Sequence, residues 1–254
     1  MNSDKIALRH LTRYLDTQTK AISAWSKQVA KHSSGKSVHG LRLATRQARA
    51  AFWVLKHSSE HLRFKKLNRK LHRLGSALGK VREMDVALSD ANHYQIKTTC
   101  LIPERMKAVK KLQKLVNKKS RKDLKRLLIK ARRSVHKMSA IQVTDAREKL
   151  SLSLHRQLAE DIESPAKLHR LRIAVKKARY AIDAMGETNH PDGRSKHPMK
   201  KLQDVLGEAH DLELLQSLTG KNSKIRAKQN RLNGKAIRLS KPTLNFAVSQ
   251  LEEN

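Results

Sequence analysis

Two stretches of this chain repeat the same spacing of one histidine and three cations. The first reads VHGLRLATRQAR from Val38, and the second reads LHRLRIAVKKAR from Leu168, 130 residues further along. In both, the four side chains stand at positions i, i+3, i+7 and i+10, which fall on one face of an α-helix within an arc of roughly 80°. We call these two sets the basic rows; they consist of His39, Arg42, Arg46 and Arg49 in the first, and His169, Arg172, Lys176 and Arg179 in the second.

A row of cations on a rigid helix has the chemistry to bind an extended polyanion. From His39 to Arg49 the helix rises about 15 Å. Arginine presents a planar fork of donors that matches a phosphate group, and a protonated histidine donates from both ring nitrogens. A dense anion favours that protonated form. The alternative for His39 and His169 is structural, with each ring donating to a backbone carbonyl to orient the helices.

The composition agrees with a basic helical protein. The 56 Lys and Arg against 22 Asp and Glu give a net charge of +34, which destabilises the fold by self-repulsion and therefore indicates an anionic partner. Nucleic acid, an anionic membrane surface and an inorganic polyanion all fit. Aromatic residues are only 3% of the chain, so aliphatic side chains must form the core. Few Gly and Pro among abundant Leu, Ala, Lys and Arg predict an all-α fold.

Cysteine usage and hydropathy predict a cytoplasmic protein. Cys100 is the single cysteine, so no intrachain disulfide can form, which fits a reducing compartment. No apolar run approaches the roughly 20 residues that span a membrane, and Met1 to Arg13 has no apolar signal core.

Helix signals surround both rows. Ser164 followed by Pro165 predicts an N-cap and first turn, and Ser34 stands at the matching place before the first row. These signals predict helices over about 36–57 and 165–185. We expect the Leu-Gly pairs ending at Gly79 and Gly207 to separate further helices.

Two strongly basic segments allow more than one interpretation. Residues 104–133 keep a helical leucine stripe and are either part of a binding surface or a solvated helix that bridges two halves. Residues 221–241 contain no acid and are either a helix or a partly disordered tail.

The repeat extends beyond the rows. Leu74, Leu78 and Gly79 align with Leu202, Leu206 and Gly207 at an offset of 128 residues. The pattern predicts a tandem duplication that forms two pseudo-symmetric four-helix bundles, residues 1–118 and 119–254.

Neighbouring helices offer a second bank of cations and four acidic residues. The secondary candidates for anion binding are Arg63, Lys66, Lys70, His72, Arg73, Lys200 and Lys201. The acids follow the Leu-Gly pairs, where we expect them to cap new helices or to pair with arginines; a divalent metal site is the alternative, although no spacing demands one. They are Glu83, Asp85, Asp211 and Glu213.

These motifs, in this order and spacing, resemble the conserved histidine α-helical domain (CHAD) family. The likeness covers about residues 4–220 and includes the segments LGKVREMDV from Leu78 and LGEAHDLEL from Leu206. Glu83 stands where the family usually has Asp, and Gln47 where it often has a second cation. The resemblance implies two four-helix bundles with a basic surface or channel between them, inorganic polyphosphate as partner, and in some members association with polyphosphate granules. It also implies that the basic rows are the binding residues.

Other functions have weaker support in the sequence. A nucleic-acid-binding protein is the main alternative, but no recognition-helix arrangement, zinc finger or aromatic platform for bases is present. A scaffold that coats anionic granules through its basic segments and an accessory module of a polyphosphate hydrolase are further alternatives. The chain has no HExxH, P-loop or alternating-glutamate ExExK signature, so we expect no enzymatic activity, no metal and no cofactor.

Overall fold

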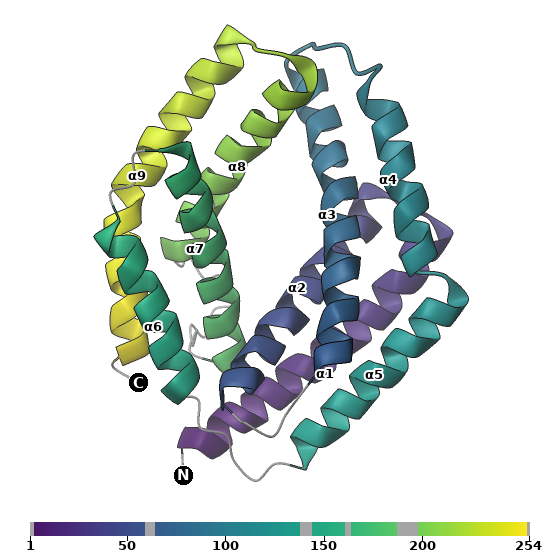
Figure 1. Ribbon diagram of the computed structural model, residues 1–254, viewed down its shortest axis with the longest axis vertical. Coiled ribbons are helices and arrows are strands. Elements are labelled where there is room, and N and C mark those ends of the chain that lie inside the picture. Colours follow the sequence, from purple (N-terminus) through teal and green to yellow (C-terminus); the bar gives the residue numbers. More distant parts are fainter. Residues whose placement is uncertain (1–2, 59–63, 138–143, 161–163, 187–197, 253–254) are drawn as a thin grey trace. The chain divides into compact units, whose positions relative to one another are not determined.

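The computed structural model describes residues 3–58, 64–137, 144–160, 164–186 and 198–252, and every regular element in these ranges is an α-helix (Figure 1). The predicted all-α fold is therefore confirmed. Two compact units, Met1–Gln142 and Val143–Asn254, are distinguished by their internal contacts and are described one at a time.

Five helices form the described part of the first unit. Helix α1 packs against α2 and α5, α2 packs against α3, and α3 packs against α4. Their bounds are Ser3–Lys31 (α1), Gly35–Ser58 (α2), Lys65–His93 (α3), Leu101–Leu115 (α4) and Lys118–His136 (α5).

The second unit contains four helices in its described residues. Helix α6 packs against α7 and α9, and α8 packs against α7 and α9. Their bounds are Thr144–Ala159 (α6), Pro165–Met185 (α7), Pro198–Thr219 (α8) and Ser223–Glu252 (α9).

The order of packing is the same in both units, although the helix counts differ. In the second unit the continuous α9 contacts both α8 and α6, whereas in the first unit α4 contacts α3 and α5 contacts α1 (Figure 1). Between α4 and α5 the helical conformation is interrupted at Val116 and Asn117. The Asn117 side chain accepts a hydrogen bond from the backbone N–H of Ser120 at 2.8 Å and caps α5. The first unit therefore has two helices, α4 and α5, in place of the single α9 of the second unit. The repeat predicts about four helices in each half, whereas the described part of the first unit has five.

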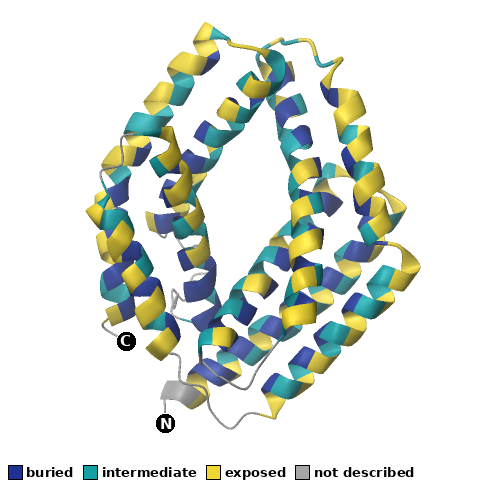
Figure 2. Ribbon diagram, in the orientation of Figure 1, coloured by how far each residue is buried: buried dark blue, intermediate teal, exposed yellow. Residues whose placement is uncertain are grey.

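Helix α5 lies in the first unit, so the compact units divide at 142/143, whereas the sequence repeat predicts a division near residue 118. Asp16 on α1 pairs with Arg132 on α5 at 3.5 Å and with His136 at 3.6 Å. Buried Leu124, Leu128, Ala131 and Val135 form the inner face of α5, and Figure 2 shows this buried face beside an exposed one. The exposed residues of α5 include Lys122, Lys125, Arg126 and Lys130.

The predicted starts of both row helices are confirmed. The Ser34 hydroxyl accepts from the backbone N–H of Ser37, and the Ser164 hydroxyl from that of Lys167, each at 3.3 Å. Each bond satisfies a backbone donor that has no partner within the first helical turn. Each cap fixes where its helix begins. Gly186, at φ 88°, ends α7 in the left-handed conformation that glycine adopts without strain.

The predicted breaks at Gly79 and Gly207 are wrong, because α3 and α8 each run through the glycine without interruption. A glycine inside a helix costs only about 1 kcal/mol relative to alanine. Burial of apolar side chains on both sides of each glycine, such as Leu78 and Val81 in α3, offsets that cost. Residues 81–91 are consequently part of α3. For residues 221–241 the helical alternative holds from Ser223 onward, since α9 starts there.

A close approach of α1 and α2 sets the position of the first row. A Cβ added to Gly40 would lie 2.5 Å from Cε2 of the Trp25 indole on α1. Only glycine leaves space for the indole at this position, which directly follows His39. On the opposite side of α2 the predicted apolar face is confirmed, with Leu41, Ala48 and Phe52 each at most 1% exposed.

Candidate functional site

The first basic row lies on α2 beside α3. His39 and Arg49 are exposed, while Arg42 and Arg46 are half-buried. The pKa of His39 is lowered from its ordinary value of 6.5, first by partial desolvation and then by repulsion from Arg82, Arg42 and Arg46. Three positive groups from two helices therefore act on one imidazole, and Arg82 on α3 belongs to the same electrostatic cluster as the row.

The last arginine of this row extends toward the same face of α3. A Cβ added to Gly75 would lie 3.7 Å from Nη1 of Arg49. Desolvation, followed by repulsion from Arg46, lowers the pKa of Arg49, although a guanidinium keeps its charge in proteins. Gly75, Gly79 and Arg82 share one face of α3 by helical spacing. The two glycines have no side chains, so this face has no bulky group between the Arg49 and Arg82 guanidinium groups.

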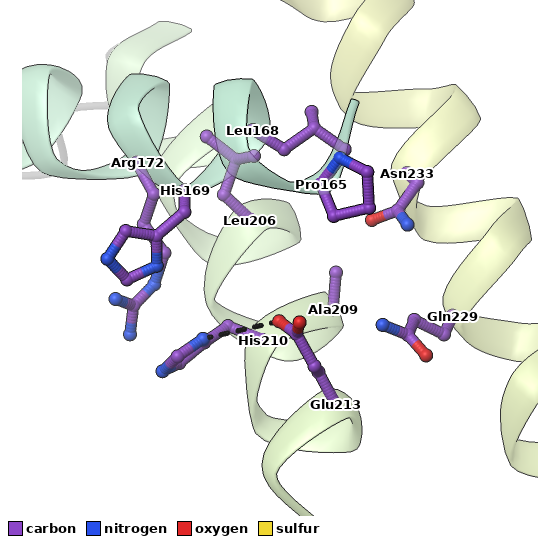
Figure 3. A pocket seen from close by; sticks show the side chains of 10 residues that line it. All are labelled: Pro165, Leu168, His169, Arg172, Leu206, Ala209, His210, Glu213, Gln229 and Asn233. Atoms are coloured by element: carbon purple, nitrogen blue, oxygen red, sulfur yellow. Dashed lines mark ion pairs between the residues drawn. The ribbon is translucent and has the colours of Figure 1, made fainter. Parts of the chain in front are cut away.

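In the second unit the row histidine lies against a second histidine. The rings of His169 on α7 and His210 on α8 have centroids 5.6 Å apart at an angle of 53°. Figure 3 shows both rings with the Arg172 side chain on one side of a small pocket of about 30 Å³. Glu213 pairs with His210 across 3.7 Å and is the acid in this pocket lining.

Arg179, the last cation of the second row, is held by neighbours inside its own unit. Its Nε donates to Oε1 of Gln203 on α8 at 3.0 Å, and its Nη1 lies 3.6 Å from the carboxylate of Asp183. The guanidinium also lies over the ring of Tyr180, which is only 4% exposed. With its side chain 19% exposed, Arg179 positions α7 against α8 and is less available to a ligand than Arg49.

The two units place corresponding residues in corresponding surroundings. His39 is near Arg82, and His169 is near His210; Arg49 approaches Gly75, and Arg179 binds Gln203. Each partner on α8 follows its counterpart on α3 by 128 residues. The sequence prediction missed Arg82 and His210 as members of the cluster. The signal was available in the segments after the Leu-Gly pairs, where only the acids were considered.

The described secondary candidates lie on α3 of the first unit and on α8 of the second. Lys70 pairs with Asp123 on α5 at 3.4 Å, and Lys200 pairs with Asp204 at 2.8 Å, so both have acidic neighbours. Arg63 lies outside the described residues. The others are exposed on α3 and α8: Lys66, His72, Arg73 and Lys201.

The four acids after the Leu-Gly pairs lie inside α3 and α8, so their predicted role as helix caps is wrong. The alternative of pairing with arginine holds for Asp85, whose Oδ1 accepts from Nε of Arg105 on α4 at 2.6 Å. Arg105 also donates to the carbonyl of Ser33 at 3.0 Å and so connects α4 with the turn before α2. Glu83 lies 3.9 Å from Lys80. Within the described ranges no group of three or more His, Cys, Asp or Glu has an arrangement that could hold a metal ion.

These helices define an all-α protein with two internally similar basic clusters. The chain belongs to the CHAD family, since the family model described as "CHAD domain" matches residues 13–219. None of the described helices is both long and apolar enough to cross a bilayer.

Solved structures support the same fold at low sequence identity. The CHAD domain from the plant Ricinus communis is 18% identical with a TM-score of 0.63, and the match covers 100% of this chain and 94% of that one. PptA from Streptomyces chartreusis is 12% identical with a TM-score of 0.57, and that match covers 97% of this chain and 99% of the other. No curated protein sequence matches this chain.

Proposed function

We propose that this CHAD-family protein binds inorganic polyphosphate through its two basic rows, with Arg82 and His210 as additional contacts, and that it performs no chemistry on the ligand. The observation that carries this proposal is the recurrence of the same cluster, a row histidine beside a basic or imidazole group of the neighbouring helix, in both units. The net charge of +34 is consistent with a polyanionic partner.

The chemistry of the rows favours a phosphate chain over nucleic acid. Proteins that bind single strands stack bases on aromatic rings, and those that read duplexes reach base edges in a groove. Here the rows present imidazole and cationic groups, and the tyrosine beside the second row is buried under Arg179. Polyphosphate has only phosphoryl groups, which such a surface can bind through charge-assisted hydrogen bonds.

We also propose that the two rows arose by a tandem duplication and that the protein associates with polyphosphate granules. Matching packing orders and matching residues at an offset of 128 support a tandem duplication, which gives one chain two similar binding surfaces. A long polyphosphate that engages both rows binds more tightly than a short one, because the second contact is intramolecular. Such a protein suits cytoplasmic granules that contain polyphosphate.

Binding to long-chain polyphosphate, duplex DNA and orthophosphate at physiological salt tests the ligand class. We expect polyphosphate to bind most tightly, orthophosphate to bind negligibly, and affinity to fall as salt rises. Equal or tighter binding of DNA would favour the nucleic-acid alternative and contradict the proposal.

Charge reversal tests the site. Replacing Arg42, Arg46, Arg172 and Lys176 with Glu should abolish polyphosphate binding while far-UV circular dichroism retains its helical signal. Survival of the affinity would exclude the rows as the site. Chain-length analysis after incubation with Mg²⁺ tests for hydrolysis, and shortened chains would show that the protein is an enzyme.

A further inference from the structure

A second basic site of different chemistry lies within the first unit, between α1 and α5. A groove of about 240 Å³ separates the C-terminal half of α1 from the N-terminal half of α5. The two helices run antiparallel: Asp16, which precedes the groove residues of α1, pairs with Arg132 and His136, which follow the groove residues of α5. The described residues that line the groove all come from these two helices, and none of them belongs to the basic rows.

The floor of the groove is apolar. Ile22, Leu124 and Leu128 line it and are only 1%, 7% and 2% exposed. The hydroxyl-bearing side chains of Thr19 and Ser23 lie beside this floor. Because these three side chains are almost inaccessible, a flat apolar group would cover mainly the carbon stems of the lysines and the arginine that line the groove, and the hydroxyls would orient its polar edge.

The described residues that line the groove include cations and no acid. The cations are Lys27, Lys118, Arg121, Lys122 and Lys125. None of them has an ion pair with another residue in the described part of the chain. Arg121 is the most informative, because its Nε is buried without a hydrogen-bond partner, and an unsatisfied buried donor costs free energy. An anion that accepts from this donor would recover that cost.

We propose that this groove binds a nucleoside polyphosphate, with the base over the apolar floor and the phosphates among the cations. An apolar floor offers nothing to a bare phosphate chain, whereas a nucleotide combines an apolar ring with several negative charges. At about 240 Å³ the groove is smaller than the roughly 300–1,000 Å³ of pockets that enclose small organic ligands, so part of the nucleotide would remain exposed to solvent. This site is separate from the proposed polyphosphate-binding rows in both its residues and its ligand.

Isothermal titration of the full chain in EDTA with ATP, adenosine and inorganic tripolyphosphate tests the site. We expect ATP to bind roughly tenfold or more tightly than tripolyphosphate, because only ATP buries an apolar group, and adenosine to bind more weakly than ATP. Equal affinity for ATP and tripolyphosphate would overturn the proposal, as would the absence of ATP binding.

Variants then locate the binding. Arg121→Ala should weaken ATP binding roughly tenfold or more, because it removes a charge-assisted donor. Ser23→Glu, at a half-buried position, should weaken it further by placing a negative charge in the groove. The matched control removes two exposed charges on α4, Lys110→Ala with Lys111→Ala, and should leave the affinity within about fivefold.

Both groove variants need a folding check by far-UV circular dichroism. If Arg121→Ala does not fold, Ser23→Glu alone decides. Unchanged ATP affinity in a folded groove variant, or an equal loss in the control, would overturn the assignment.

Discussion

Replacing Arg42 and Arg46 with glutamine removes two neighbouring charges from the first basic row and keeps two polar side chains in their place. Both arginines are half-buried on α2 and act electrostatically on His39. A charge-assisted hydrogen bond contributes about 1.5 kcal/mol, so two lost phosphate contacts amount to about 3 kcal/mol. We therefore expect polyphosphate affinity to fall on the order of a hundredfold.

Two further measurements make this prediction specific. The dependence of log affinity on log salt should become shallower by about 1.4, if polyphosphate releases counterions as single-stranded nucleic acid does. The pKa of His39, followed by NMR in the free protein, should rise toward its ordinary value, because two of the three repelling arginines are gone. Desolvation and Arg82 remain, so some depression should persist.

The control removes the same net charge elsewhere. Lys110→Gln with Lys111→Gln changes two exposed residues on α4 and should weaken binding by roughly fivefold or less. An equal loss in both double variants would show that total charge, rather than the row, determines affinity. Retention of affinity in the row variant would refute the reasoning outright.

Three other predictions follow from the first unit. The pKa of His39 is depressed in the free protein, and a bound anion favours the charged form of its ring, so polyphosphate affinity should rise as pH falls below 6.5. Binding titrations across this pH range should show a flatter dependence for His39→Gln. An identical pH profile in the variant would contradict a role for His39 in binding. By the same linkage, the unfolded chain binds the His39 proton more readily, so this residue lowers folding stability as pH drops through 6.5. In urea titrations, Gly40→Ala should lower the free energy of unfolding by about 1 kcal/mol, because the clash with the α1 tryptophan outweighs the gain in helix propensity. Gly79→Ala has open space around its added Cβ and should raise the free energy of unfolding by about 1 kcal/mol. A change of the same sign in both variants would contradict the packing argument. Asp85→Asn should destabilise the first unit by about 2 kcal/mol, because it leaves the partly buried Arg105 without its carboxylate, and an unchanged thermal midpoint would show that the pair contributes nothing.

Local chemistry made much of the fold predictable. The serine caps at Ser34 and Ser164 fixed the starts of α2 and α7, and the leucine and alanine spacing of α2 identified its buried face. The glycines misled the prediction, since Gly79 and Gly207 lie within long helices. A helix continues through a glycine when packing on both sides outweighs the local cost, and packing depends on neighbours that a single segment does not reveal.

The division into units depended on similar long-range information. From the sequence, residues 118–136 could have belonged to either half, because the residues of a basic amphipathic helix do not reveal which helices it packs against. The pairing of Asp16 with Arg132, together with the buried leucines of α5, assigns this helix to the first unit.

The sequence alone determined that two helices each carry a one-sided row of a histidine and three cations, because helical periodicity converts spacing directly into a shared face. It could not determine which cations remain available to a ligand. Arg49 and Arg179 hold the same place in their motifs, yet Gln203 and Asp183 bind only the second of them, whereas Gly75 faces the first. Tertiary structure decided this difference, and it brought Arg82 and His210 to the rows, because contacts between helices depend on how they pack and not on the residues of one helix.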